Sequence, residues 1–308
     1  MRKHNENRWL LLASTILYWF PLLLISFLPR RPAFGIASHV GRLKYRRWRS
    51  RIKLQRANME LRLGASPEQV EGWLERSFEL ATYEDLECCF YPRMTKENIG
   101  GFIEIRGLEN LTSALGRGKG VILYSGHVRG HFTFFVALGL LGYRLNLISS
   151  PGRSGRNLIE SWFYGRRRTT LMEEKLGYRI LLMQPPNFGI AVQAANALKR
   201  NEGIIIEVDL PLTRQNAEVC FLNGRARFPY GPALLAQVTG APLLNFYLYR
   251  TDKRLPQIAE IGPPFYVSND LAGAIQHCAT QIGDKIFQYP ASWNTWLFSK
   301  WNLWEGLE

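Results

Sequence analysis

The 308-residue chain has 46% hydrophobic residues, 21% charged residues and a formal net charge of +14. This balance is that of an ordinary globular protein and excludes a disordered, collagen-like or low-complexity chain. A mean hydropathy of −0.14 excludes many membrane spans but leaves room for one, and four cysteines provide no disulfide framework, which favours a reducing compartment.

A long apolar run lies close to the N-terminus. Residues 9–28 contain no charge. As a helix they would extend ~30 Å, which matches the hydrocarbon thickness of a bilayer, and a membrane helix tolerates Pro21. The length of the run and the Pro-Arg-Arg-Pro sequence that follows it argue against a cleaved signal peptide. We therefore expect residues 1–30 to form a membrane anchor with one transmembrane helix.

A strongly basic segment follows the apolar run. Between Arg30 and Met59 there is no Asp or Glu. Such a segment binds nucleic acid, an anionic membrane surface or an acidic protein. Directly after an apolar helix, the anionic membrane surface is the favoured partner and nucleic acid is not expected. The excess of Lys and Arg on this side of the helix places the rest of the chain in the cytoplasm. The ten basic residues are Arg30, Arg31, Arg42, Lys44, Arg46, Arg47, Arg49, Arg51, Lys53 and Arg56.

The elements predicted further along the chain form two groups. Residues 42–80 look helical, with Ser66 as an N-cap before Pro67, so residues 31–80 are expected to form a basic amphipathic helical segment. Short apolar runs and Gly-containing turns then alternate over residues 81–308. Strands are predicted at 102–105, 120–124, 144–148, 178–182, 203–208, 217–222 and 242–250. Helices are predicted at 132–141, 158–176, 189–199, 231–239 and 272–288. The alternation predicts an α/β fold with a central, mostly parallel sheet flanked by helices.

Candidate catalytic residues follow two of the predicted strands. In such sheets, ligands bind beyond the carboxyl ends of the strands. His127 follows one strand and precedes a helix, a position typical of a general base; a bond to the backbone is the alternative. Asp209 ends another strand and is a candidate to orient a catalytic group, bind a substrate hydroxyl or cap the next turn. Glu207 alternates with Asp209, so only one of the two is expected to reach the site of His127.

Two further groups are candidates for binding. His131 lies four residues after His127, and such a pair is able to hold zinc. The sequence lacks both the Glu of a zincin motif and a third ligand nearby, so no metal is expected. Arg166, Arg167 and Arg168 are candidates to bind phosphate or a phosphopantetheine arm; a solvated helix face is the commoner fate of such a triplet.

Several short segments are weak signals one by one, but their order and spacing along the chain are specific in combination. With the N-terminal apolar run, they extend almost from one end of the chain to the other. They are Arg56-Ala-Asn-Met-Glu-Leu, Ser66-Pro-Glu-Gln, Gly120-Val-Ile-Leu-Tyr-Ser-Gly-His127, Lys175-Leu-Gly-Tyr178, Val208-Asp209, Phe221-Leu-Asn-Gly-Arg-Ala, Gly231–Pro242 and Tyr289-Pro-Ala-Ser-Trp293. In these segments the chain resembles the lauroyl/myristoyl acyltransferase family, the late acyltransferases of lipid A biosynthesis in bacterial inner membranes.

This resemblance implies a glycerolipid-acyltransferase-like fold and an O-acyl transfer without cofactor, metal or covalent acyl-enzyme. His127 would deprotonate an acceptor hydroxyl, which attacks the thioester of acyl carrier protein or coenzyme A. Asp209 matches the family's acidic residue after the strand, and one of the three arginines matches a basic residue near the charged groups of the acceptor. Asn223 and Gly224 match the loop after the next strand, as substrate-binding positions.

The family also places a carboxylate five residues after the catalytic His, where this chain has Phe132. An imidazole without that partner loses its orientation and the stabilisation of its charged form, a loss of on the order of 10⁴ in rate in serine hydrolases. Three hypotheses remain open. Asp209 or an acid of residues 83–87 supplies the partner, His131 acts as a relay or as the base, or the chain binds lipid and acyl donor without efficient turnover.

The expected function is that of a membrane-anchored acyltransferase at the cytoplasmic face of a bacterial inner membrane. The acceptor would be a membrane lipid or glycolipid similar to lipid A. The basic surface would suit an anionic membrane and an acidic acyl carrier protein. A non-catalytic lipid-binding homologue and a hydrolase that uses His127 with His131 are the alternatives.

Overall fold

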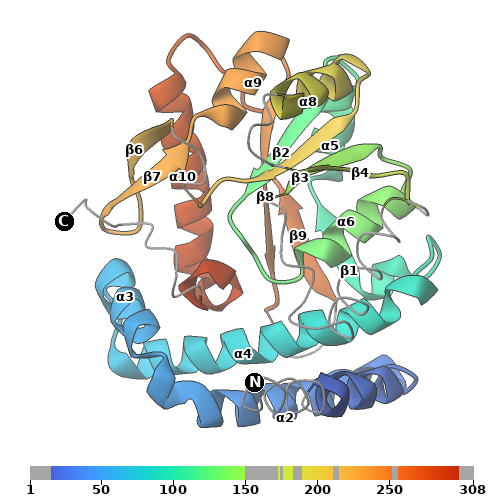
Figure 1. Cartoon of the computed structure of the whole chain (residues 1–308), viewed down its shortest axis with the longest axis vertical. Coiled ribbons are helices and arrows are strands. Elements are labelled where there is room, and N and C mark those ends of the chain that lie inside the picture. The colour runs from blue at the N-terminus through green and yellow to red at the C-terminus, as the bar shows by residue number, and fades with distance from the viewer. Residues whose placement is uncertain are drawn as a thin grey trace, which may run out of the picture.

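The computed structural model describes residues 15–149, 173, 176–182, 189–210, 215–251 and 256–297. Its centre is a seven-stranded sheet with the order β1-β9-β8-β2-β5-β3-β4 (Figure 1). Neighbouring strands are parallel except for β8 with β9. The strands are β1 (Ile103–Arg106), β2 (Val121–Ser125), β3 (Leu145–Ser149), β4 (Arg179–Leu182), β5 (Gly203–Glu207), β8 (Leu243–Tyr249) and β9 (Gln257–Ile261). The predicted α/β fold with a mostly parallel central sheet is confirmed.

Helices flank the sheet and cover its central strands. β2 and β8 are buried along their whole length, as expected for strands that are covered on both faces. A separate antiparallel hairpin of β6 (Asn216–Cys220) and β7 (Arg225–Pro229) packs against α10. The flanking helices are α5 (Leu108–Leu115), α6 (His131–Leu140), α8 (Gly189–Lys199), α9 (Gly231–Thr239) and α10 (Leu271–Gln288).

The predicted strands and helices agree with the structure within one or two residues where the structure describes them. β7, β9 and α5 were not predicted. In the turn between β6 and β7, Leu222 and Asn223 have φ angles of 47° and 52°, and a Leu in this conformation is no turn signal in a sequence. Most of the helix predicted at 158–176 lies outside the described residues.

A layer of long helices covers the carboxyl edge of the sheet. α4 (Pro67–Phe90) begins at the predicted N-cap, because Ser66 Oγ accepts a hydrogen bond from the N–H of Gln69. α4 runs below the sheet in Figure 1, and α2 (Arg30–Trp48) runs along it. At Gly41 of α2 a Cβ would lie 2.6 Å from Glu79 Cα of α4, so this crossing requires a glycine. A short turn, η1 (Arg49–Arg51), and α3 (Lys53–Leu63) connect the two helices.

The predicted boundary at residue 80 lies inside α4. This helix continues for ten residues into the range expected to be purely α/β, up to Phe90. Its second half is almost completely buried, which explains why an amphipathic pattern could not be followed there. α2 begins at Arg30, twelve residues before the range 42–80 that looks helical in the sequence.

Residues 15–25 are helical and pack on the same layer. Trp19 and Leu22 are buried, and Tyr18 Oη donates a hydrogen bond to Asp85 of α4 at 2.5 Å. The opposite face is exposed, with Leu17 at 74%. In the part of the chain that the structure describes, no helix combines the length and apolar character needed to span a membrane. The predicted transmembrane run begins at residue 9, so its first six residues lie outside that part.

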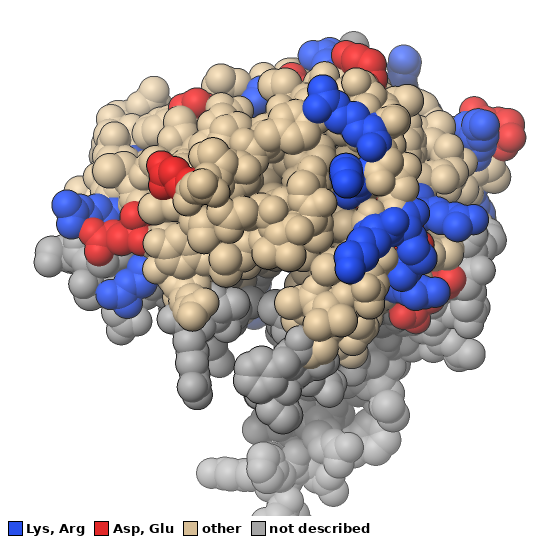
Figure 2. Space-filling view, turned by 90° about the horizontal axis from the view of Figure 1, so that it is seen from above, with Lys and Arg blue, Asp and Glu red and all other residues tan. Residues whose placement is uncertain are grey.

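The side of the molecule opposite the α2–α4 layer, at the top of Figure 1, is also charged. Figure 2 shows this face, on which Lys and Arg gather on one side. Basic residues are therefore present both near the α2–α4 layer and on the face that lies across the sheet from it.

Candidate active site

His127 lies in the loop between β2 and α6, at the carboxyl edge of the sheet. Its side chain is 19% exposed. β2 pairs with β5 on one side and β8 on the other, which fixes the start of the loop. The end of the loop is Gly130, with a φ of 79°, where a Cβ would lie 2.3 Å from the amide nitrogen of Gln257. Packing therefore fixes both ends of the loop that carries His127.

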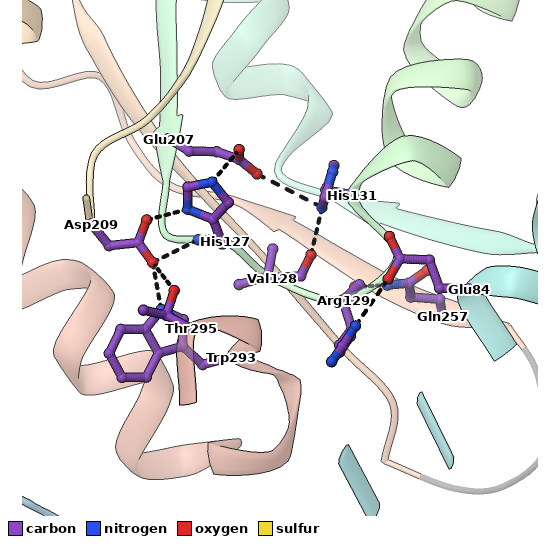
Figure 3. A network of polar contacts seen from close by, with 10 residues as sticks. All are labelled: Glu84, His127, Val128, Arg129, His131, Glu207, Asp209, Gln257, Trp293 and Thr295. Atoms are coloured by element: carbon purple, nitrogen blue, oxygen red, sulfur yellow. Dashed lines mark hydrogen bonds and ion pairs between the residues drawn. The ribbon is translucent and has the colours of Figure 1, made fainter. Parts of the chain in front are cut away.

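Asp209 holds one nitrogen of the His127 ring. Its Oδ1 lies 2.5 Å from His127 Nδ1. Its Oδ2 accepts three hydrogen bonds, from the backbone N–H of His127 at 2.9 Å, Trp293 Nε1 at 2.6 Å and Thr295 Oγ1 at 2.7 Å (Figure 3). The side chain of Asp209 is completely buried. These donors hold the carboxylate in one orientation, and through it the imidazole.

Glu207 holds the other nitrogen of the ring. Its Oε2 lies 2.9 Å from His127 Nε2. We predicted that only one of Glu207 and Asp209 reaches this site, and that prediction is wrong. β5 ends at Glu207 and the chain turns at Asp209, so the two-residue alternation of a strand no longer separates the two side chains. The imidazole therefore lies between two carboxylates.

The charges of these three groups are strongly coupled. Burial lowers the pKa of His127, but Glu207 and Asp209 outweigh it, and the pKa lies well above 6.5. Burial raises the pKa of both carboxyl groups, yet the interaction with His127 and the hydrogen bonds hold the pKa of each below its ordinary value. The favoured state at neutral pH is an imidazolium between two carboxylates.

His131 lies on the far side of Glu207 from His127 (Figure 3). Its Nδ1 is 2.7 Å from the carbonyl oxygen of Val128 and 3.7 Å from Glu207 Oε1. A ring nitrogen that binds a carbonyl carries the proton, so Nδ1 of His131 is a donor. Phe132 follows and packs against the ring of His131, at 4.4 Å between centroids.

The acids of residues 83–87 bind other groups. Glu84 contacts Arg129 at 3.5 Å, and Glu87 accepts a hydrogen bond from Thr133 Oγ1 at 2.6 Å. The carboxylate at Nδ1 of His127 is Asp209, which is one of the partners that the sequence analysis left open.

The last described residues hold the loop in place, a feature that sequence reasoning missed. The backbone N–H of Asn294 donates to the carbonyl of His127 at 2.7 Å, and the N–H of Arg129 donates to the carbonyl of Ser292 at 2.8 Å. These contacts come from η5 (Pro290–Ser292) and η6 (Asn294–Leu297). The signal was the Tyr-Pro-Ala-Ser-Trp segment, which the resemblance included without assigning it a role.

Of the predicted substrate-binding residues, the structure describes only Asn223 and Gly224. Arg166, Arg167 and Arg168 are outside the described residues. Asn223 and Gly224 form the turn of the β6–β7 hairpin, where a Cβ on Gly224 would lie 2.0 Å from Arg62 Nη1 of α3, and the network of Figure 3 does not include them. Within the described part of the chain, no three or more His, Cys, Asp and Glu side chains are arranged to hold a metal ion.

Comparisons with known proteins place this site in context. A family model described as bacterial lipid A biosynthesis acyltransferase matches residues 1–302. The phosphatidylinositol mannoside acyltransferase of Mycolicibacterium smegmatis is 27% identical over 246 residues, which are 78% of this chain and 76% of that protein. The protein of the same name from Mycobacterium tuberculosis H37Rv is 26% identical over 194 residues, 62% of this chain and 57% of that protein.

Among solved structures, the 1-acyl-sn-glycerophosphate acyltransferase of Thermotoga maritima aligns with a TM-score of 0.36 and 12% identity. The alignment covers 83% of this chain and 96% of that chain.

Proposed function

The chain belongs to the bacterial lipid A biosynthesis acyltransferase family, and we propose that it transfers a fatty acyl group from a thioester to a hydroxyl of a lipid or glycolipid acceptor, with His127 as the general base. The observation that carries this assignment is the imidazole of His127 at the carboxyl edge of the sheet, bound at both nitrogens by carboxylates. An oriented imidazole is the group that removes a proton from a hydroxyl near neutral pH.

The chemical step needs one base and no further reactant. Neutral His127 accepts the hydroxyl proton at Nε2 while the acceptor oxygen attacks the thioester carbonyl. The tetrahedral intermediate collapses with cleavage of the carbon–sulfur bond, and the imidazolium returns the proton to the departing thiolate. The products are an ester and a free thiol, so atoms and charge balance.

Asp209 serves as the positioning carboxylate for this base. Its bond to Nδ1 keeps a proton on that nitrogen, so that the lone pair of the neutral ring lies on Nε2. It also stabilises the imidazolium that forms during the attack. Asp209 thus replaces the carboxylate that the family places at the position of Phe132, and it reaches His127 from a different strand.

Glu207 occupies the position beside Nε2 where the acceptor hydroxyl has to enter. In the resting state it stabilises a protonated, inactive imidazole. We propose that the acceptor displaces the Glu207 carboxylate from Nε2, after the ring has released its proton to Glu207 or to solvent.

The acceptor class follows from the family and its named relatives. The relatives are phosphatidylinositol mannoside acyltransferases, which supports a glycolipid with free sugar hydroxyls as the acceptor of this chain. Acyl carrier protein and coenzyme A are both thioester donors that suit the reaction. The chemistry that we propose needs no cofactor.

A membrane location suits a lipid acceptor. Exposed apolar side chains on residues 15–28, among them Leu17, Phe20 and Phe27, lie in the same layer as the basic helix α2. Apolar side chains beside cations favour the interface of an anionic bilayer. These features support our proposal of a protein held at the cytoplasmic face of the inner membrane, with residues 1–30 as its anchor.

An acyl-transfer assay tests the function directly. The full chain in detergent is incubated with radiolabelled acyl-acyl carrier protein or acyl-coenzyme A and with phosphatidylinositol mannoside or a lipid A precursor. Products are separated by thin-layer chromatography and identified by mass. The variant His127→Ala is compared with His277→Ala. His277 belongs to α10, stacks on Phe265 and is not part of the network of Figure 3.

We expect an acylated lipid with the wild-type chain and with His277→Ala, and none with His127→Ala. Free fatty acid formed at the same rate without an acceptor would indicate a hydrolase instead. A folded wild-type chain that binds these lipids but forms no product with either donor would support the non-catalytic alternative.

A further inference from the structure

A small cavity lies behind the loop that carries His127. Its volume is about 10 Å³, which is room for one water molecule. The polar side chains that line it are Tyr83, Glu84 and Glu87 of α4, Arg129 of the loop, Tyr249 of β8 and Arg250 after it, Gln257 of β9 and Ser292 of η5. The cavity therefore lies where five separate parts of the fold meet.

Four polar atoms of these residues are buried and have no hydrogen-bond partner among the described residues: Tyr83 Oη, Arg129 Nε, Arg250 Nη1 and Gln257 Oε1. Tyr83 is 1% exposed and Gln257 is 3% exposed, so bulk water does not reach their side chains. Buried polar groups in folded proteins nearly always have a partner. All four residues line the same cavity, so a single small ligand in it would be a partner that they share.

Another nitrogen of Arg129, Arg250 and Gln257 is already paired with a neighbouring group. Arg250 Nη2 donates to Glu87, Arg129 Nη1 donates to Glu84 at 3.5 Å, and Gln257 Nε2 donates to the carbonyl oxygen of Arg129 at 2.8 Å. Three of the four atoms without a partner therefore belong to side chains that a neighbouring group already holds.

The chemistry of these atoms identifies the ligand. Two guanidinium N–H groups donate, the Gln257 carbonyl oxygen accepts, and the Tyr83 hydroxyl also accepts. A water molecule accepts two hydrogen bonds and donates two, which matches this set. An anion would meet Glu84 and Glu87, and a cation would meet the two arginines, so neither fits as well as a neutral molecule. We propose that one ordered water binds here and makes Arg129 a positioning residue for His127.

Arg129 transmits the effect of this water to the catalytic loop. It lies two residues after His127, and its backbone N–H and carbonyl are bound by Ser292 and Gln257. The water would add a fixed point on its side chain and connect that side chain to Tyr83 of α4. The expected effect of this water on turnover rests on the proposed function, whereas the water site itself does not.

The test compares Tyr83→Phe with Tyr266→Phe in the full chain. Tyr83→Phe removes one ligand of the water and keeps the ring that packs against Phe34. Tyr266 is 41% exposed and provides the matched control. Three measurements are made: a crystal structure of the wild-type chain, hydrogen–deuterium exchange of residues 126–131, and kcat and KM in the acyl-transfer assay.

The wild-type crystal structure should contain one water within about 3.2 Å of these atoms. In Tyr83→Phe, exchange of the loop amides should become about two- to tenfold faster, the ratio for one net hydrogen bond, and kcat should fall by a similar factor with KM unchanged. Tyr266→Phe should change neither.

The inference is overturned if the crystal structure shows the four atoms bound to one another with no water between them. It is also overturned if the two variants exchange at the same rate. An inactive wild-type chain would contradict the proposed function, whereas the crystal structure and the exchange rates would still decide whether the water site exists.

Discussion

At the residue scale, the central feature is an imidazole that two carboxylates hold in its charged form. A general base has to be neutral, yet Glu207 and Asp209 raise the pKa of His127 well above 6.5. The two carboxylates differ in role. Asp209 is bound by three donors and fixes the ring, whereas Glu207 lies at Nε2, the nitrogen that receives the proton in the reaction that we propose. The pH dependence of the rate separates these roles.

The first prediction concerns Glu207→Gln. Activity requires neutral His127, so the rate should rise with pH through the raised pKa of this group. Removal of one neighbouring negative charge lowers that pKa, so the rising limb of the kcat profile should move to lower pH. The measurement is kcat between pH 5 and 10, with Glu218→Gln on the β6–β7 hairpin as a control for the loss of one surface carboxylate. An unchanged limb in Glu207→Gln would contradict the assignment of this pKa to His127.

The second prediction concerns Asp209 and Thr295, which donates a hydrogen bond to it. Asp209→Asn should lower kcat on the order of 10²- to 10⁴-fold, because an amide no longer fixes the required tautomer or stabilises the imidazolium. Thr295→Val removes only one of three donors to Oδ2 and should lower kcat about tenfold. KM for the acceptor should stay unchanged in both variants. Equal losses in the two variants would show that Thr295 acts in some way other than through Asp209.

The sequence predicted which strand ends carry this site, but not how its side chains are arranged. His127 and Asp209 were identified because each follows a strand, and strand ends meet at one edge of a parallel sheet. Glu207 and Asp209 were expected on opposite faces because the alternation of a strand was extended to Asp209, whereas β5 ends at Glu207 and the chain turns after it. Trp293 and Thr295 lie 84 and 86 residues after Asp209, and no local pattern links residues across such a distance.

At the scale of elements, the α2–α4 pair is the feature that tertiary packing determines most clearly. The two helices meet where Gly41 faces the backbone of Glu79. Ser38 Oγ and Arg42 Nε bind the same Glu79 carboxylate from either side of this crossing, at 2.8 Å and 2.6 Å. Close backbone contact and a partly buried ion pair therefore act at one point.

The third prediction tests this crossing with two glycines of the same helix. Gly41→Ala should destabilise the fold by about 1–3 kcal/mol, because the added Cβ collides with backbone that cannot move easily. Gly35→Ala should stabilise it by about 0.5–1 kcal/mol, because Gly35 has no atom near its Cβ position and alanine favours a helix. Urea unfolding of both variants gives the two free energies. A stabilising Gly41→Ala would show that the helices do not cross as closely as described.

Periodicity and turn residues predicted most of the strands and helices, and the exceptions have physical causes. β9 is a short strand that pairs with β1 and β8, so tertiary contacts rather than its own pattern define it. The second half of α4 is buried on nearly all sides, which removes the polar face on which a helical pattern depends. Where burial is one-sided, as at the start of α4, the sequence prediction and the structure agree.

At the scale of the whole molecule, the α2–α4 layer combines exposed apolar and basic side chains. Leu43, Trp48 and Leu54 are 49%, 46% and 58% exposed, and they alternate with the cations of the basic segment. The same layer covers the edge of the sheet where His127 lies, since Arg129 of the catalytic loop contacts Glu84 of α4. A lipid bound to this layer would be close to the catalytic edge of the sheet.

The last prediction tests whether this layer binds anionic membranes. The variant Arg46→Gln/Arg47→Gln/Lys53→Gln removes three exposed cations, each worth about 1 kcal/mol at an anionic surface, so binding to vesicles with anionic lipid should weaken about 100-fold. The control Arg117→Gln/Lys119→Gln/Lys199→Gln changes the net charge equally near α5 and α8, at the top of Figure 1, and should have little effect. Vesicle sedimentation measures both variants at low and high salt. Equal losses would mean that net charge, rather than the α2–α4 layer, determines membrane binding.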